Sequence, residues 1–515
     1  MNLLSTTFRV YTRRYLRKIE AYKRQPQATQ EAQLAYLLSQ LARTHYGKSH
    51  DAVSLTTYQD FVKRVPLTDY VDLEPLIHQM RLGERNVLWP GRTRWFARSS
   101  GTTNAKSKFI PVTRTCLENC HYRGGRDMMS LYLSHYPNSR FFMGKGLTLG
   151  GSHQIEETGG MSKEGDLSAI ILQNLPTWAD AIRTPSRRVA LLPDWEEKLA
   201  GIAKETIGQN VTSLSGVPSW NMVMIRYLLD FTGKSNLLEL WPKLEVFQHG
   251  GVSFEPYREQ YKRLIPSPDM HYMECYNASE GFFALQDEPD RSDMLLALDY
   301  GVFYEFIDMD DYQGLQSTTI PLWEVEKGRN YAMVISATNG LWRYIIGDTV
   351  TFTETNPYRI RITGRTKLFI NAFGEEVIID NAERAIKRAC EASNAQVEEY
   401  TAGPRFMDHE ANASHEWIIE FSKPPRDVEF FSQVLDNTLR EVNSDYDAKR
   451  TNNVTLKPPI VRVVPPGTFL GWMAARGKVG GQNKVPRLAN DRTHLESLDQ
   501  FLLTGKVEPQ GPQGL

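Results

Sequence analysis

The chain has 515 residues, of which 41% are hydrophobic and 23% charged, and its formal net charge is -1. This length exceeds what one hydrophobic core supports, so roughly two to four domains or subdomains are expected. The balanced charge gives no electrostatic support for binding nucleic acid or an anionic membrane. The chain begins without a secretory signal, and no apolar run approaches the roughly 18 residues of a membrane span, so we expect a cytoplasmic protein.

Four cysteines occur at positions 116, 120, 275 and 390, too few for a disulfide scaffold in so long a chain. Cys116 and Cys120 lie one helical turn apart and precede His121. A metal site there would need further ligands, and none follow at a useful spacing. Ordinary reduced thiols are therefore expected.

The N-terminal part is predicted to be largely helical, because apolar residues recur there at helical spacing. Residues 1–50 are expected to form two helices, with Leu34, Leu37, Leu38 and Leu41 on one face. Further helices are expected in residues 58–82, with a turn and restart between Pro66 and Asp69, and in residues 113–135, with a cap at Thr113 or Thr115.

A polar stretch, Ser99–Lys108, lies between two predicted strands, residues 94–98 and 109–113. A flexible, hydroxyl-rich turn exposes backbone N–H groups and adds side-chain donors, which is how proteins hold phosphate oxygens. The same residue types also suit an ordinary polar hairpin loop. The stretch is not a Walker A loop, because it has a single glycine and the residues after it are predicted to form a strand.

Two later strands end in residues suited to a ligand site. The predicted strand 244–248 is followed by His249-Gly250-Gly251, and a glycine pair past the carboxyl end of a strand is where α/β sheets bind ligands. The predicted strand 270–276 runs into Asn277-Ala278-Ser279-Glu280-Gly281. Both segments are therefore candidates for ligand contact.

The strands that follow are predicted to be antiparallel. They fall into two groups, residues 294–308 and 331–353, and the second group contains Asp348. Strand–helix alternation early in the chain and antiparallel strands later predict a mixed α/β fold with a β-rich subdomain.

The organisation changes near residue 364, where a compact α+β unit of common domain size begins. Its predicted helices cover residues 378–393 and 427–443, and its predicted strands cover residues 396–402 and 417–422. A basic, glycine-rich stretch, residues 476–487, lies near its end. Lysines on such a loop can swing into a site, although most such loops are only solvated.

Three segments in order resemble the signatures of the adenylate-forming superfamily. Ser99-Ser100-Gly101-Thr102-Thr103 is similar to the first signature, Tyr276-Asn277-Ala278-Ser279-Glu280 to the second and Tyr344-Ile345-Ile346-Gly347-Asp348 to the third. Ser-Lys-Phe-Ile-Pro at 107–111 and Gly-Gln-Asn-Lys-Val-Pro-Arg at 481–487 narrow the resemblance. The chain thus resembles a bacterial member of the auxin-responsive acyl-acid amido synthetases, the Gretchen Hagen family.

The resemblance implies an α/β fold with a large N-terminal domain, made of two α/β subdomains and a β-barrel-like part. We expect this ATP- and acyl-acid-binding domain to span residues 1–363, followed by a hinge at 364–367 and a small, mobile α+β lid domain at 368–515. The implied activity is that of an AMP-forming carbon–nitrogen ligase that uses ATP and Mg²⁺. A carboxylic acid, auxin-like or otherwise aromatic, is adenylated and then transferred to the amine of an amino acid.

The resemblance also implies roles for individual residues. Lys484 and Glu280 would be catalytic, with Lys484 assisting adenylation and Glu280 binding Mg²⁺. The nucleotide-binding residues would be Ser99, Ser100, Gly101, Thr102, Thr103, Gly251, Tyr276, Ser279, Asp348, Arg365 and Lys367. Among these, Asp348 would bind ribose, and Arg365 or Lys367 would sit at the hinge.

Several alternatives stay open at this level. A thiol acceptor such as coenzyme A shares the first half-reaction, and a catalytically inactive nucleotide-binding relative would keep the fold. An arginine is common beside the glycine of the third signature, and in this chain Arg343 stands one place earlier. Whether an arginine contacts the nucleotide here is therefore an open question. The sequence does not show whether Lys106, Lys108 or Lys478 contacts the nucleotide. It does not show the oligomeric state either.

Replacing Lys484 with alanine should lower acid-dependent exchange of pyrophosphate into ATP by about a hundredfold or more. The physical reason is that a cation aimed at the charge developing on the α-phosphate contributes ~3 kcal/mol to such a step. Exchange kinetics of Lys484→Ala beside Lys478→Ala check this, and unchanged exchange in Lys484→Ala would refute the role.

Overall fold

The structure is a computed structural model. It describes residues 3–99, 108–150, 156–158, 162–252, 254, 257–289, 291–366, 369–406, 413–453, 455–476 and 485–505. The described residues divide into two compact units, one up to Gly364 and one from Arg365 onward. The proposed hinge concerns movement between these units and stays a prediction, as do the domain limits drawn around it.

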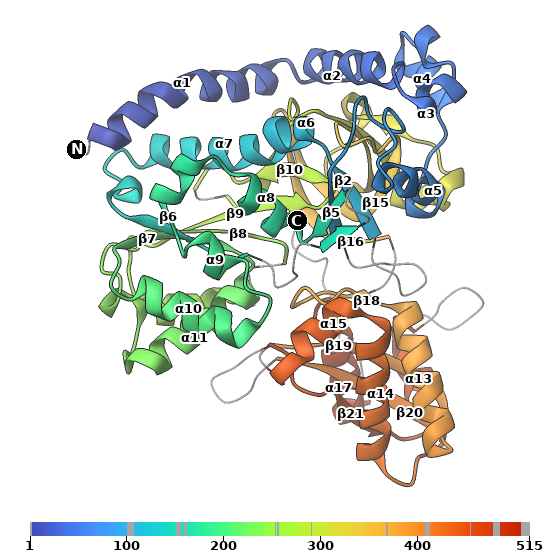
Figure 1. Ribbon diagram of the computed structural model, residues 1–515. Helices are drawn as coiled ribbons and strands as arrows, with labels where there is room; N and C mark the ends of the chain where they lie inside the picture. The colour runs from blue at the N-terminus through green and yellow to red at the C-terminus, as the bar shows by residue number, and fades with distance from the viewer. Residues whose placement is uncertain are drawn as a thin grey trace. The chain divides into compact units, whose positions relative to one another are not determined.

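The first unit contains helices in its N-terminal half and on both sides of a large sheet. The described helices are α1 (Leu3–Arg24), α2 (Pro26–Leu41), α3 (His45–Ser49), α4 (Tyr58–Arg64), α5 (Tyr70–Arg81), α6 (Arg114–Cys116), α7 (Tyr122–His135), α8 (Leu167–Asn174), α9 (Arg187–Ala190), α10 (Trp195–Thr206), α11 (Pro218–Thr232) and α12 (Arg258–Leu264). Helix α1 packs along α7, and Figure 1 shows the pair on one side of the sheet with α10 and α11 on the other.

The strands of the first unit include those predicted at residues 94–98, 109–113, 244–248 and 270–276. They are β1 (Trp95–Ser99), β2 (Lys108–Val112), β3 (Lys145–Thr148), β4 (Glu156–Thr158), β5 (Ser162–Gly165), β6 (Arg183–Thr184), β7 (Val211–Gly216), β8 (Val246–Gly250), β9 (His271–Ala278), β10 (Gly281–Leu285), β11 (Met294–Leu296), β12 (Val302–Asp308), β13 (Ile320–Pro321), β14 (Asn330–Ala337), β15 (Tyr344–Thr355) and β16 (Tyr358–Arg365).

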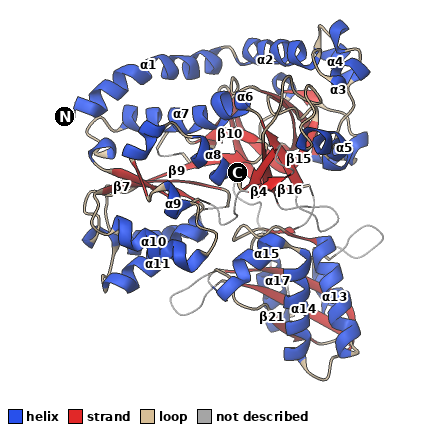
Figure 2. Cartoon of the chain, viewed as in Figure 1, coloured by secondary structure: helices blue, strands red, loops and turns tan. Residues whose placement is uncertain are grey.

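Two sheets result. The larger has twelve strands in the order β13-β12-β14-β15-β16-β11-β10-β9-β8-β7-β3-β6, and the smaller has four in the order β2-β1-β5-β4. Within the larger sheet, β3, β6, β7, β8 and β9 pair in parallel, and pairing is antiparallel from β9–β10 onward. The mixed α/β fold is confirmed (Figure 2), and the strands expected to form a β-barrel-like part are continuous with the parallel strands.

Local sequence signals explain where two of the helices begin. Asp69 caps α5: its carboxylate accepts hydrogen bonds from the backbone N–H groups of Val71 (2.8 Å) and Asp72 (3.3 Å), and the Asp72 carboxylate accepts from the N–H of Asp69 at 3.0 Å. This capping box confirms the restart predicted at Asp69. The hydroxyl of Thr113 accepts from the N–H of Cys116 at 3.0 Å, which confirms the cap predicted there.

A buried charge cluster, Asp287 with Lys23 and Arg359, ties distant parts of the first unit together. The carboxylate of Asp287 contacts Arg359 Nη1 at 2.7 Å and Lys23 Nζ at 2.8 Å. The Asp287 and Arg359 side chains are each only 1% exposed. Because a buried charge is very unfavourable without a partner, the cluster fixes α1, the segment after β10 and β16 against one another.

The second unit is a small α+β structure. Its described elements are β17 (Phe369–Ile370), β18 (Val377–Ile378), α13 (Ile379–Ser393), β19 (Gln396–Arg405), β20 (Ser414–Lys423), α14 (Val428–Val442), α15 (Ser444–Arg450), β21 (Ile460–Val464), α16 (Thr468–Ala475) and α17 (Thr493–Thr504). The three strands β19, β20 and β21 form its main sheet. None of the helices in the described parts of the chain is long and apolar enough to cross a membrane.

Substituting Asp287 with asparagine should lower the free energy of unfolding of the first unit by about 3 kcal/mol, because it removes the buried carboxylate that pairs with both Arg359 and Lys23 and leaves Arg359 with Glu288 as its main partner. Denaturant titrations followed by tryptophan fluorescence measure the change. Asp51→Asn is the matched control: its ion pair with Arg64 is exposed, so the unfolding midpoint should move far less. Equal shifts in the two variants would contradict a stabilising role for the cluster.

Candidate functional site

The carboxyl ends of β3, β7, β8 and β9 lie at one edge of the large sheet, because these strands pair in parallel. The strands end at Thr148, Gly216, Gly250 and Ala278, which are small or hydroxyl-bearing residues. Open α/β sheets bind ligands outside this edge, where loops rather than strands follow. This edge is therefore the expected position of a ligand-binding site.

Two adjacent glycines at the end of β8 are required by the backbone. A Cβ atom added to Gly250 would lie 2.4 Å from the carbonyl oxygen of Cys275, so only glycine lets β8 and β9 approach here. Gly251 has a φ of 87°, in the left-handed region that glycine adopts most easily. Gly251, predicted to contact the nucleotide, thus lies at the ligand-binding edge, and its contact with nucleotide stays a prediction.

The second signature forms the turn of a hairpin between β9 and β10. Ala278 pairs with Gly281, so Ser279 and Glu280 occupy the turn itself. The Glu280 side chain is buried, and its backbone carbonyl accepts a hydrogen bond from Asn339 Nδ2 at 2.8 Å. A buried carboxylate next to a ligand-binding edge suits a role toward a cation, because burial strengthens its field. The Mg²⁺ contact predicted for Glu280 stays a prediction.

The structure brings the second and third signatures together. The hydroxyl of Tyr276 on β9 donates a hydrogen bond to the Asp348 carboxylate on β15 at 2.5 Å, although the residues are 72 positions apart. Tyr276 is buried against Phe283, with ring centroids 5.0 Å apart, and Asp348 is half-buried. A fixed carboxylate at this place can accept hydrogen bonds from a pair of ribose hydroxyls.

Arg343 precedes the third signature but is committed to the interior. Its guanidinium contacts the buried Glu305 carboxylate at 2.9 Å, Thr319 Oγ1 at 2.7 Å and the carbonyl oxygen of Val65 at 2.8 Å. Its φ of 43° lies in the left-handed region, so the backbone too is fixed by this packing. The sequence left open whether Arg343 contacts the nucleotide. These contacts show that Arg343 is a structural residue and does not face a nucleotide.

Several buried polar atoms near the sheet edge have no hydrogen-bond partner among the described residues. They are His121 Nε2, Asn221 Oδ1, Gln248 Nε2 and His249 Nδ1. Gln248 and His249 lie at the end of β8, and Asn221 lies in the first turn of α11, just after β7. Buried polar groups are nearly always paired. Gln248 and His249 are consecutive residues of β8, so their side chains face opposite sides of the sheet and do not form one group. Of these residues, His249 lies in a segment that the sequence marked as a candidate for ligand contact, whereas no local pattern distinguishes Asn221 and Gln248 from packed core residues.

Other predicted residues lie partly outside the described chain. Ser99 is described and pairs with Lys108 across the β1–β2 hairpin, and Lys108 is buried with Nζ 5.8 Å from the Tyr70 ring centroid. Arg365 forms an ion pair with Glu376 at 3.1 Å within the second unit. The predicted residues outside the described ranges are Ser100, Gly101, Thr102, Thr103, Lys106, Lys367, Lys478 and Lys484.

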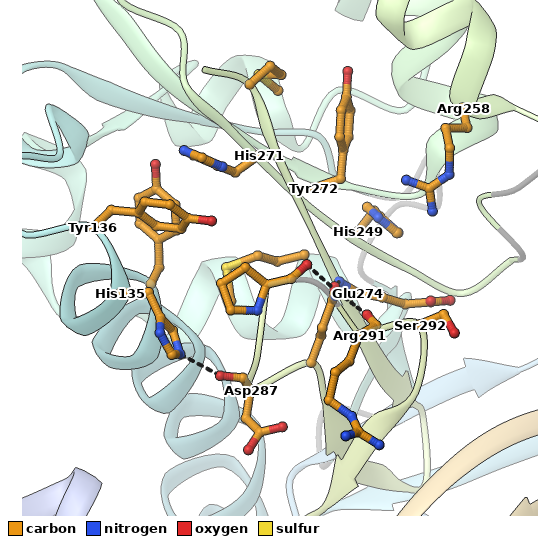
Figure 3. Close-up of a pocket in the computed structure, with 15 residues that line it drawn as sticks. His135, Tyr136, His249, Arg258, His271, Tyr272, Glu274, Asp287, Arg291 and Ser292 are labelled. Carbon is orange, nitrogen blue, oxygen red and sulfur yellow. Dashed lines mark hydrogen bonds between the residues drawn. The ribbon is translucent and has the colours of Figure 1, made fainter. Parts of the chain in front are cut away.

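A separate cavity of about 350 Å³ lies beside the first half of β9, residues 271–274 (Figure 3). On one side His271 stacks on Tyr136 with ring centroids 3.7 Å apart, and on the other side lie His249, Arg258 and Glu274. Burial, with a smaller effect of Arg258, lowers the pKa of His249 to about 3. The lining includes neither Tyr276 nor Asp348, so this cavity is not the predicted nucleotide site.

Comparison with protein families gives matches along most of the chain. Residues 15–270 match the GH3 family N-terminal domain, residues 295–365 the GH3 family central domain and residues 380–493 the GH3 family C-terminal domain. The three matches follow one another in chain order. They cover the strand of the third signature and most of the second unit, and β9 with the second signature lies between the first two matches.

Individual relatives are distant but similar over their full length. The chain is 22% identical to indole-3-acetic acid-amido synthetase GH3.4 of Arabidopsis thaliana, over 96% of this chain and 95% of the relative. Among solved structures, GH3.15 acyl acid amido synthetase aligns with a TM-score of 0.61 at 19% identity, covering 95% of this chain and 96% of that one. A 2-hydroxyisobutyryl-CoA ligase aligns with a TM-score of 0.56 at 14% identity, covering 92% and 91%. The structural matches show a shared fold.

Replacing Tyr276 with phenylalanine should raise the KM for ATP about tenfold with a smaller effect on kcat, because a hydrogen bond to a charged group stabilises the bound state by about 1.5 kcal/mol. Steady-state kinetics at varied ATP measure this. Tyr272→Phe on the same strand is the matched control, since the Tyr272 hydroxyl has no partner among the described residues. If the two variants show the same KM, Tyr276 does not orient Asp348 for the nucleotide.

Proposed function

The chain belongs to the GH3 family, and from that premise we propose how its residues carry out the reaction of an acyl-acid amido synthetase. The enzyme is an ATP-dependent ligase. It adenylates a carboxylic acid with release of pyrophosphate and then transfers the acyl group to the amine of an amino acid with release of AMP. The names of the relatives support an acid of the indoleacetic type as the first candidate substrate.

The observation that carries the proposal is the hydrogen bond from Tyr276 to Asp348. It places an oriented carboxylate beside the strand that ends in the turn with Glu280. In the proposed mechanism, Asp348 accepts hydrogen bonds from the ribose hydroxyls of ATP, and Tyr276 and Ser279 line the nucleotide. Gly251 at the end of β8 lets the nucleotide approach the backbone closely.

We propose that Glu280 provides the protein ligand to Mg²⁺. Mg²⁺ is commonly held by one or two carboxylates together with phosphate oxygens, so a single buried carboxylate at this edge fits it. When bound, Mg²⁺ neutralises charge on the phosphate oxygens during pyrophosphate release. The hydrogen bond from Asn339 to the backbone carbonyl of Glu280 supports this role, because it fixes the turn that holds the carboxylate.

The negative charge of the triphosphate requires further hydrogen-bond donors and cations. We propose that the hydroxyl-rich loop beginning at Ser99 holds the phosphates that leave as pyrophosphate, and that Lys484 stabilises charge at the α-phosphate. Both roles follow from the resemblance of these segments to the family's signatures. Positioned cations and backbone donors act in this way because they stabilise the transition state without reorganising.

A thiol acceptor in place of the amine is the second candidate. It shares the adenylation step, and the similarity to a 2-hydroxyisobutyryl-CoA ligase concerns the fold. The amine is favoured because relatives that are similar in sequence are named amido synthetases and amino acid synthetases. Product identity separates the two candidates directly.

The enzyme should catalyse exchange of radiolabelled pyrophosphate into ATP only when a suitable carboxylic acid is present. With pooled acids and amino acids, ATP and Mg²⁺, mass spectrometry should detect an acyl-amino acid and AMP. Glu280→Gln should reduce the exchange by about a hundredfold, because the lost charge no longer holds the metal against the phosphates. No exchange across a broad acid panel would contradict adenylation, and a thioester as the only product would replace the amine with a thiol.

A further inference from the structure

The cavity beside the first half of β9 lies where β10 parts from that strand (Figure 3). Strand β10 pairs with β9 down to Leu285, which lies opposite Cys275. One residue further, the main-chain N–H of Gln286 donates to the carbonyl of Glu274 at 2.9 Å. Beyond that point none of the described strands pairs with this side of β9, and the segment after Gln286 lines the cavity instead.

The main chain of Tyr272 is left unpaired at this edge. In a parallel pair alternate residues face the neighbouring strand, and the N–H of His271 donates to the carbonyl of Glu245 at 2.8 Å, on the β8 side. The N–H of Glu274 faces the other way and donates to the side-chain oxygen of Gln286 at 3.0 Å. Tyr272 alternates in phase with Glu274, so its N–H and C=O face the cavity side. The described residues supply neither group with a hydrogen-bond partner.

Side-chain hydrogen bonds hold the wall opposite this edge in place. The Gln286 amide donates to the carbonyl of Pro289 at 3.3 Å and also to that of Arg291. From α7, Nε2 of His135 donates to the carbonyl of Asp287 at 2.6 Å. The segment is thus tied to Gln286 and to α7 rather than to β9, and the fold itself keeps the gap open.

One side of the cavity is aromatic. Tyr136 stacks on His271, and Tyr132 lies next to Tyr136 with ring centroids 5.0 Å apart. Burial, opposed by smaller effects of nearby carboxylates, lowers the pKa of His271, so this ring is neutral near pH 7. This side therefore presents uncharged ring surfaces, which suit an apolar group.

The other side of the cavity carries its charge, from Arg258 and Glu274 (Figure 3). Arg291 and Asp287 also belong to the lining, but Arg291 contacts Asp293 at 2.7 Å and Asp287 belongs to the buried charge cluster. A guanidinium has five N–H donors, so Arg258 can bind a carboxylate in addition to its other contacts.

We propose that this cavity binds an N-acylated amino acid that completes the edge of β9. The amide N–H of the ligand donates to the carbonyl of Tyr272, and its carboxylate accepts from the N–H of Tyr272. Opposed residues of antiparallel strands exchange two hydrogen bonds in this way, so the ligand takes the place that a further residue of β10 would occupy. Its acyl group lies on the aromatic side and its carboxylate on the Arg258 side. The contact with Tyr272 uses main-chain atoms alone.

The inference rests on the proposed function, because an N-acylated amino acid is the class of product that the ligase makes. It assigns this class a second site, apart from the nucleotide. Four strand residues, about 13 Å, separate Tyr272 from Tyr276, so ligand and nucleotide do not overlap. The volume of about 350 Å³ lies within the range of roughly 300–1,000 Å³ that small-molecule sites occupy.

The first test compares three ligands by isothermal titration calorimetry on the full chain, without ATP. They are phenylacetylglycine, its ester analogue phenylacetylglycolic acid, and the dipeptide phenylalanylglycine. The amide should bind at least about tenfold more tightly than the ester, which leaves the carbonyl of Tyr272 without a donor. The dipeptide should bind more weakly than the acylated amino acid, because its ammonium group loses water beside the aromatic side. Equal affinity for amide and ester, or tighter binding of the dipeptide, overturns the proposal.

The second test uses two substitutions at one position. Tyr272→Pro removes the free N–H without removing a hydrogen bond to β8, and Tyr272→Ala loses the same side chain but keeps the N–H. Phenylacetylglycine should bind at least about tenfold more weakly to Tyr272→Pro than to Tyr272→Ala, whereas the affinity for AMP should be the same in both. Equal affinity for phenylacetylglycine overturns the proposal.

If Tyr272→Pro does not fold, the ratio of amide to ester affinity in the wild type and in Tyr272→Ala decides. The two proposals fail separately, because conjugate binding is measured without ATP and adenylation by pyrophosphate exchange. Tight, amide-dependent binding without any acid-dependent exchange would contradict the proposed function and support the site. Acid-dependent exchange without amide-dependent binding would overturn the site alone.

Discussion

The hydrogen bond from Tyr276 to Asp348 is the contact on which the arrangement of the site depends. It joins the last of the parallel strands to a strand of the antiparallel half of the same sheet. Because the large sheet is continuous through β9 and β10, the turn that holds Glu280 and the strand that holds Asp348 are fixed relative to one another. Two acids with different roles can then serve one nucleotide without a separate loop to align them.

Charges in the first unit fall into two groups with different functions. Arg343 with Glu305, and Arg359 with Asp287 and Lys23, are buried pairs that fix strands and helices in place. Once buried, these charges depend on their partners, so they are not available to a ligand. Glu280 and Asp348 are different: Glu280 lies in the turn between β9 and β10, and Asp348 lies in β15 where its register with β14 shifts. The scaffold thus separates the charges that hold it together from those that face the ligand edge.

The carboxylates of the site do not by themselves specify the substrate. An adenylating enzyme needs carboxylates and cations whatever its acid substrate, so Glu280 and Asp348 do not distinguish one acid from another. In the proposed scheme, the hydroxyl-rich loop and Lys484 stabilise the charge of the phosphates.

The sequence by itself determined the mixed α/β fold, the caps at Asp69 and Thr113, and the strand that leads into Glu280, because each depends on neighbours within a few residues. Its three signatures, which act through residue type and order, also identified the family. Only the tertiary structure decided that Arg343 is a core residue, that Tyr276 holds Asp348 and that His121 contacts Asn277 on β9. These depend on contacts between segments from 38 to 156 residues apart. Local periodicity and spacing carry no information about which distant carboxylate or amide a side chain will meet, because that is set by how the strands pair.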